Sequence, residues 1–221
     1  MPMDPRTKQT VRALLDRYPS GYATEEAGFT VTDSATGIFR LLCLGVLADD
    51  STPSEGAMAG MRAMLRRGFD AVAPLAEADG REVADALARA GHPDPEDGAR
   101  NLCAAARLVR DRWNGDVNAI HRADGGDGGR LDALLADIPG MDEAGRAVFL
   151  REAQIFWPEA GPFLDAHAAR AARRLGLPDR ADTLLTDVAR GEREEELSWL
   201  VGALALVDAH DEYGEIEAAV G

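Results

Sequence analysis

The feature that most constrains the fold of this chain is a helical hydrophobic period that runs through almost every segment. No stretch shows the alternation that is typical of a strand. The nearly apolar residues 35–49 predict a central buried helix, and the amphipathic residues 95–113 predict a long helix that ends at Asn114 and Gly115. The sequence therefore predicts an all-α protein of roughly ten to twelve helices joined by short connections.

The length of 221 residues suits one large domain or two small ones that share an interface. No apolar run approaches the roughly 20 residues of a membrane span, and the N-terminus is polar, so we expect a soluble, cytoplasmic protein. Cys43 and Cys103 lie in apolar helical contexts, which is more typical of small core residues in a reducing compartment than of a disulfide. The histidines are scattered, and no metal-ligating pattern accompanies the cysteines.

The charge balance is strongly acidic, with 39 acidic residues against 24 basic ones and a net charge of −15. Lys8 is the only lysine. This charge argues against indiscriminate binding of nucleic acid, because neutralising phosphates supplies non-specific affinity. The same composition also suits a cytoplasm of very high salt, where the Debye length of about 3 Å removes long-range repulsion.

One predicted helical stretch is broken in its middle, where residues 134–150 read LLADIPGMDEAGRAVFL. A Pro-Gly turn between two helices leaves the first backbone N–H groups of the second helix without partners inside that helix. Together with the helix dipole, these groups bind a phosphate without any basic side chain. The break at Pro139 and Gly140 therefore predicts a phosphate-binding site at the start of the second helix.

From about Ile38 to Pro178 the chain resembles the helix-hairpin-helix DNA glycosylases, most closely those of the endonuclease III type. The resemblance depends on the long helix followed by Asn114-Gly115-Asp116-Val117, on the Pro139-Gly140 hairpin, and on an aspartate that opens a helix shortly afterwards in FLDAHAAR. It implies two intimately packed helical domains: residues 30–136 as a six-helix, barrel-like domain, and residues 1–29 with 137–221 as a second helical domain. The second would carry the hairpin, at about residues 131–150, and Asp165.

The resemblance also implies roles for individual residues. Asp165 matches the essential carboxylate, which stabilises positive charge on the sugar and orients water once the damaged base is flipped from the duplex. From the residues alone, a helix cap is the favoured interpretation of Asp165, and the cap and the catalytic role are compatible. Residues that match the hairpin's DNA-binding positions are Pro139, Gly140, Met141, Asp142, Gly145 and Arg146.

Several positions depart from the family pattern. Ala144 stands where bifunctional members carry a lysine, so strand cleavage through a Schiff base is not expected. Asp142 replaces the second glycine of the turn; it either repels phosphate or caps the helix and occupies the N–H groups of the phosphate-binding site, and Arg146 could offset part of this. No cysteine follows Cys103, so we expect no [4Fe–4S] cluster and no other cofactor or metal.

The remaining candidates have a structural interpretation beside the functional one. Asp50 matches the wedge that fills the gap left by a flipped base, or it ends a helix. Trp157 and Phe163 flank Asp165 and belong either to the core or to a base pocket. His167 resembles the family's Asp-x-His arrangement, although a lone histidine on a helix is more often structural. The arginines of two basic clusters are phosphate contacts or solvated faces: Arg66, Arg67, Arg170, Arg173 and Arg174.

Taken together, the sequence favours a monomeric, nucleoid-associated protein of base-excision repair. It would bind double-stranded DNA with a damaged or flipped base and hydrolyse the N-glycosidic bond without lyase activity. The alternative is a catalytically degenerate relative that binds DNA structures or a protein partner, and a purely structural helical protein is the third interpretation. The hydrolytic interpretation requires the carboxyl of Asp165 to be accessible, and a buried carboxyl would contradict it.

Overall fold

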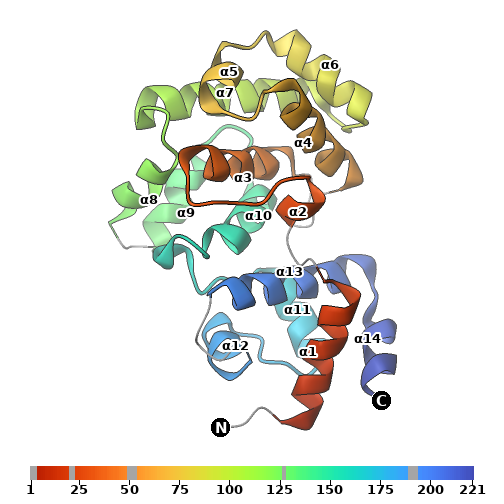
Figure 1. Ribbon diagram of the computed structural model, residues 1–221. Helices are drawn as coiled ribbons and strands as arrows, with labels where there is room; N and C mark the ends of the chain where they lie inside the picture. Colours follow the sequence, from red (N-terminus) through yellow and green to blue (C-terminus); the bar gives the residue numbers. More distant parts are fainter. Residues whose placement is uncertain (1–3, 20–22, 49–53, 126–127, 189–193) are drawn as a thin grey trace. The chain divides into compact units, whose positions relative to one another are not determined.

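The computed structural model describes residues 4–19, 23–48, 54–125, 128–188 and 194–221. These residues form fourteen α-helices and one short 3-10 helix, and they contain no strand (Figure 1). The all-α prediction is confirmed for them, with more helices than expected because several are short. None of the described helices has both the length and the apolar character that a membrane span requires.

The chain divides into two compact units. The continuous unit comprises Ala23–Phe149, and the discontinuous unit comprises Met1–Tyr22 and Leu150–Gly221. The sequence analysis also expected the N-terminus to join the C-terminal part. The division differs from the expected one at the hairpin, which belongs to the continuous unit, whereas Asp165 belongs to the discontinuous unit.

The continuous unit is built around α3, whose apolar sequence buries ten of its 13 residues. Ser34 begins this helix by accepting a hydrogen bond from the amide of Gly37. Both α4 and α7 pack against α3, and α5 and α6 cover α7. The helices of this unit are α2 (Ala23–Glu26), α3 (Ala35–Leu47), α4 (Glu55–Arg67), α5 (Val72–Glu77), α6 (Gly80–Ala90), α7 (Pro95–Trp113), α8 (Asn118–Asp124), α9 (Gly128–Ala136) and most of α10 (Glu143–Ala153).

Two predictions for the continuous unit are confirmed. Residues 35–47 form the central buried helix, and Asn114 ends α7 in the left-handed conformation with a φ of 52°. Cys43 and Cys103 are free thiols buried in the core, and burial raises the pKa of both. Both cysteines are therefore unreactive packing residues.

The discontinuous unit is organised around α13, which is apolar on nearly all sides. This helix packs against α11, α1 and α12, and α14 packs against α1 (Figure 1). Alanines of α11 and leucines of α13 form the centre of the core. The elements of this unit are α1 (Pro5–Arg17), the end of α10, η1 (Pro158–Ala160), α11 (Ala166–Arg174), α12 (Ala181–Asp187), α13 (Glu194–His210) and α14 (Tyr213–Val220).

Candidate functional site

The turn between α9 and α10 is a tight backbone hairpin. The amide of Ile138 donates to the carbonyl of Leu135 at 3.0 Å, and the amide of Met141 donates to the carbonyl of Ile138 at 3.0 Å. Gly140 has a φ of +80°, and a β-carbon added there would lie 2.7 Å from Cβ of Asn101. Both the backbone conformation and the contact with α7 therefore require glycine at this position. Pro139 and Gly140 are half-buried.

Close packing of α10 against α3 determines how the hairpin is held. A β-carbon on Gly145 would lie 2.4 Å from the carbonyl oxygen of Gly45, and the side chain of Met141 fills the adjacent space. Met141 is only 3% exposed, and Gly145 is also buried. Met141 and Gly145, which were both expected to contact DNA, therefore lie in the contact between α3 and α10, and their contact with DNA stays a prediction.

Asp142 is exposed and caps α10. Its Oδ1 accepts a hydrogen bond from the amide of Gly145 at 2.9 Å, so the capping alternative is confirmed. The amides of Glu143 and Ala144, at the start of α10, have no acceptor inside the helix by its geometry. Ala144 is half-buried. The cap thus engages the amide of Gly145, which could otherwise bind a phosphate. It also places a negative charge beside the amides of Glu143 and Ala144.

Arg146 does not offset that charge. Its Nε donates to Oδ1 of Asp132 at 2.7 Å, and its Nη1 donates to the carbonyl of Met141 at 3.3 Å. The side chain is 18% exposed. The expectation was that Arg146 could offset part of the Asp142 charge; its guanidinium is instead engaged with Asp132 on the neighbouring helix and links α9 to α10.

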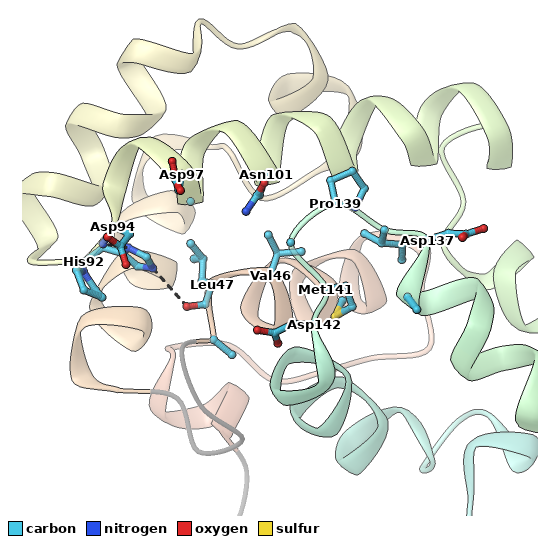
Figure 2. A pocket seen from close by; sticks show the side chains of 16 residues that line it. Val46, Leu47, His92, Asp94, Asp97, Asn101, Asp137, Pro139, Met141 and Asp142 are labelled. Atoms are coloured by element: carbon cyan, nitrogen blue, oxygen red, sulfur yellow. Dashed lines mark hydrogen bonds between the residues drawn. The ribbon is translucent and has the colours of Figure 1, made fainter.

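A groove with a volume of about 560 Å³ lies beside the hairpin. Figure 2 shows the end of α3, the first half of α7 and the hairpin around it. Four aspartates line it, and two of them are paired with arginines: Asp97 with Arg100 at 2.7 Å and Asp137 with Arg112 at 3.0 Å. The groove is lined by Val46, Leu47, Ala48, His92, Pro93, Asp94, Asp97, Gly98, Asn101, Ala136, Asp137, Ile138, Pro139, Gly140, Met141 and Asp142.

His92 is a structural histidine of this groove. Its Nε2 lies 3.3 Å from the carbonyl oxygen of Leu47, and its Nδ1 lies 3.2 Å from the amide of Asp94 (Figure 2). Both ring nitrogens are therefore engaged. In the described part of the chain, no group of three or more histidine, cysteine, aspartate or glutamate side chains could hold a metal ion.

Asp165 opens α11 as its N-cap, but its carboxylate is buried. Oδ1 accepts a hydrogen bond from the amide of Ala168 at 3.0 Å. Oδ2 accepts from Arg151, at 3.2 Å from Nε and 2.7 Å from Nη2. The side chains of Asp165 and Arg151 are only 5% and 4% exposed. The accessible carboxylate that the hydrolytic interpretation requires is therefore not what this structure shows.

A wider polar network holds this ion pair. The carbonyl of Arg151 accepts hydrogen bonds from Nε2 of Gln154 at 2.9 Å and from Oγ of Ser198 at 2.5 Å. The side chain of Gln154 in turn accepts from the amide of Phe163 at 2.9 Å. The network ties the end of α10 to α13 and to the segment before Asp165, so the carboxylate is fixed from several directions.

The sequence analysis did not identify Arg151. The signal that could have found it is an arginine placed in the apolar sequence VFLREAQIFW, because a buried arginine needs a carboxylate partner.

Trp157 is fully buried at 0% exposure, so the base-pocket interpretation is corrected in favour of core packing. Phe163 remains half-buried. Asp50, the expected wedge, lies outside the described residues.

His167 packs against charged groups of the discontinuous unit. Its Nδ1 lies 2.5 Å from Oδ2 of Asp208, which also accepts from Arg170 at 2.6 Å. Burial raises the pKa of Asp208, but hydrogen bonds from Tyr213, Arg170 and His167 outweigh it and hold the pKa below its usual value. Burial and the hydrogen bond to Asp208 raise the pKa of Tyr213 to about 12. His167 thus belongs to an ion-pair cluster that ties α11 to α13.

Of the other basic residues named in the sequence, those of α11 contact neighbouring side chains and those of α4 are exposed. Arg173 pairs with Asp179 at 2.9 Å, and Arg174 lies 3.8 Å from the ring centre of Tyr213. Arg66 and Arg67 are exposed at the end of α4. The arginines of α11 are therefore engaged with other groups of the discontinuous unit, and their contact with phosphate stays a prediction.

Comparisons with known proteins add no identification. No model of a known protein family matches this chain, and no curated protein matches it.

Proposed function

We propose that this chain is a non-hydrolytic relative of the helix-hairpin-helix DNA glycosylases, and that it binds distorted or damaged duplex DNA through the hairpin of α9 and α10. One observation carries the proposal: the hairpin retains a glycine-dependent turn at Gly140, while Asp165 is buried in an ion pair with Arg151. The retained turn supports binding, and the buried carboxylate argues against hydrolysis.

The state of Asp165 supports the loss of hydrolysis. A carboxylate that stabilises a sugar cation or orients water must reach the reacting atoms. Here the Asp165 oxygens accept three hydrogen bonds, from Ala168 and Arg151. Breaking a buried ion pair leaves an uncompensated charge, which costs about 3 to 5 kcal/mol. Such a cost opposes any rearrangement that would free the carboxylate for chemistry.

The hairpin supports binding of a DNA phosphate by uncharged backbone amides. The first amides of α10 point away from the helix, and the helix dipole favours an anion there. Asp142 opposes this attraction, because a carboxylate about 6 Å from a phosphate costs about 2 to 3 kcal/mol at an effective dielectric of about 20. Salt of about 1 M shortens the Debye length to about 3 Å, so this binding is expected to be strongest at high ionic strength.

A second candidate function is monofunctional hydrolysis of the N-glycosidic bond. The observation that favours it is the position of Asp165 as the N-cap of the first long helix after the hairpin, which is where the resemblance puts the family's carboxylate. Hydrolysis would then require that the pair with Arg151 open when DNA binds.

The two functions are separated by one experiment on the unmodified protein. Duplexes that each carry a single damaged base are incubated with the protein at low and at molar salt. Binding is measured by mobility shift, and abasic sites are revealed by alkali treatment. Binding without alkali-labile sites supports the proposal, alkali-labile sites support hydrolysis, and the absence of binding at every salt concentration excludes both.

A further inference from the structure

We propose that the carboxamide of Asn101 is the side chain that donates a hydrogen bond to a DNA phosphate in the groove beside the hairpin. This inference rests on the proposed DNA-binding function and identifies a further residue of that site. No sequence motif marks this position, because Asn101 belongs to α7 and becomes part of the site only through its contact with the turn.

The position of Asn101 ties it to the hairpin. A β-carbon on Gly140 would meet Cβ, Cγ and Nδ2 of Asn101 at 2.7, 3.0 and 3.0 Å, so the two residues are in direct contact. Figure 2 shows the side chain on the α7 wall of the groove, near Pro139 and facing the end of α3 at Val46. Asn101 is half-buried, which holds the carboxamide in place and leaves one side of it open to the groove.

The chemistry of the groove singles out this side chain. Of the described lining residues, only His92 and Asn101 have side chains with N–H donors in their usual states. Both ring nitrogens of His92 are engaged with the backbone. Asn101 makes no side-chain hydrogen bond to any residue that the structure describes. Its two N–H donors are therefore free for an incoming acceptor.

A neutral donor suits this acidic surface. The carboxylates of Asp94, Asp97, Asp137 and Asp142 line the same groove and cannot donate when they are charged. A carboxamide can bind a phosphate oxygen without releasing counterions, so its contribution does not decline steeply with salt. Its contribution should therefore be similar at low and at molar salt, whereas the repulsion by the carboxylates is screened.

The test uses Asn101→Leu, which keeps a side chain of similar shape against Gly140 and removes the donors. The probe is a fluorescent duplex with one tetrahydrofuran abasic-site analogue, titrated by anisotropy at 0.2 and 2 M KCl. We expect about tenfold weaker binding at both salt concentrations, the usual effect of losing a hydrogen bond to a charged group. Gln9→Leu, which removes an exposed amide on α1, is the matched control and should bind within about twofold of the unmodified protein.

A second measurement separates a phosphate contact from a packing role. Each phosphate that flanks the lesion is replaced in turn by an uncharged methylphosphonate. At one position the replacement should weaken binding by the unmodified protein about tenfold and leave Asn101→Leu almost unaffected.

Equal responses of both proteins at every position, or wild-type affinity of Asn101→Leu, would overturn the role of Asn101 and leave the proposed function intact. Failure of the unmodified protein to bind the probe at either salt concentration would overturn both.

Discussion

Oδ2 of Asp165 lies 2.7 Å from Nη2 of Arg151, and both side chains are almost completely buried. The residue that the family resemblance marks as catalytic is therefore part of the interior of its unit. Since Oδ1 also caps α11, the carboxylate both pairs with Arg151 and caps a helix, and its side chain is only 5% exposed. The buried ion pair between Asp165 and Arg151 is the reason that we propose binding without hydrolysis, in contrast to an active glycosylase.

The ion pair should have a large effect on stability when one partner is changed. Asp165→Asn keeps the cap on α11, because asparagine caps about as well as aspartate, but it removes the negative charge that pairs with the buried Arg151. We expect the free energy of unfolding to fall by about 3 to 5 kcal/mol, measured by urea denaturation and circular dichroism. The double variant Arg151→Met/Asp165→Asn should recover most of that loss. An Asp165→Asn protein as stable as the unmodified one would show that the pair is not buried.

Removing the charge of Asp142 should change DNA binding in a salt-dependent way. Asp142→Asn keeps a cap on α10 and removes the repulsion of phosphate. We expect about tenfold tighter binding at 0.1 M KCl and less than about twofold at 2 M KCl, because the repulsion is screened. Asp16→Asn, an exposed position on α1, controls for the change in net charge and should have little effect. An equal gain at both salt concentrations would argue against electrostatic repulsion at the hairpin.

The close contact between α3 and α10 should make Gly145 intolerant of any side chain. Gly145→Ala would place a β-carbon 2.4 Å from the carbonyl oxygen of Gly45, so the two helices must separate. We expect the free energy of unfolding to fall by about 2 kcal/mol, seen as a lower thermal midpoint. Gly80→Ala is the matched control, because a β-carbon there meets nothing within 4 Å. A similar midpoint for both variants would contradict the packing described here.

The cluster around Asp208 predicts the response of stability to acid. Hydrogen bonds lower the pKa of Asp208 in the folded protein from its ordinary value of 3.8. The stabilisation is therefore fully present above about pH 4, and it is lost as the pH falls through the lowered pKa. Asp208→Asn should unfold more readily at pH 7 and lose less stability between pH 4 and pH 2. An unchanged slope in that range, measured by urea denaturation, would exclude this role.

Much of the fold could be predicted from the sequence, because local physical chemistry determines it. The apolar run that forms α3, the left-handed end of α7 at Asn114, and the caps at Asp142 and Asp165 all depend on residues close together in the chain. The capping alternatives at both aspartates were derived from the residues themselves.

The site was predicted less well, because its state depends on which residues face each other. Arg151 lies 14 residues before Asp165, and no periodicity indicates that the two side chains meet. The pairing of Arg146 with Asp132 and the burial of Trp157 depend equally on tertiary packing. A family pattern identifies the positions of candidate residues. Whether each side chain can reach a substrate or DNA depends on the helices that pack against it.

The most direct test of the account is a single-turnover assay for base release. The unmodified protein, in excess over duplexes that each carry one damaged base, is incubated in 2 M KCl under conditions where mobility shift shows binding. The products are treated with alkali and separated by size. The account predicts bound DNA that shows no strand breaks above the protein-free background after alkali. Time-dependent, alkali-induced breaks at the damaged base would contradict it and would establish Asp165 as a carboxylate that leaves its pair with Arg151 to act.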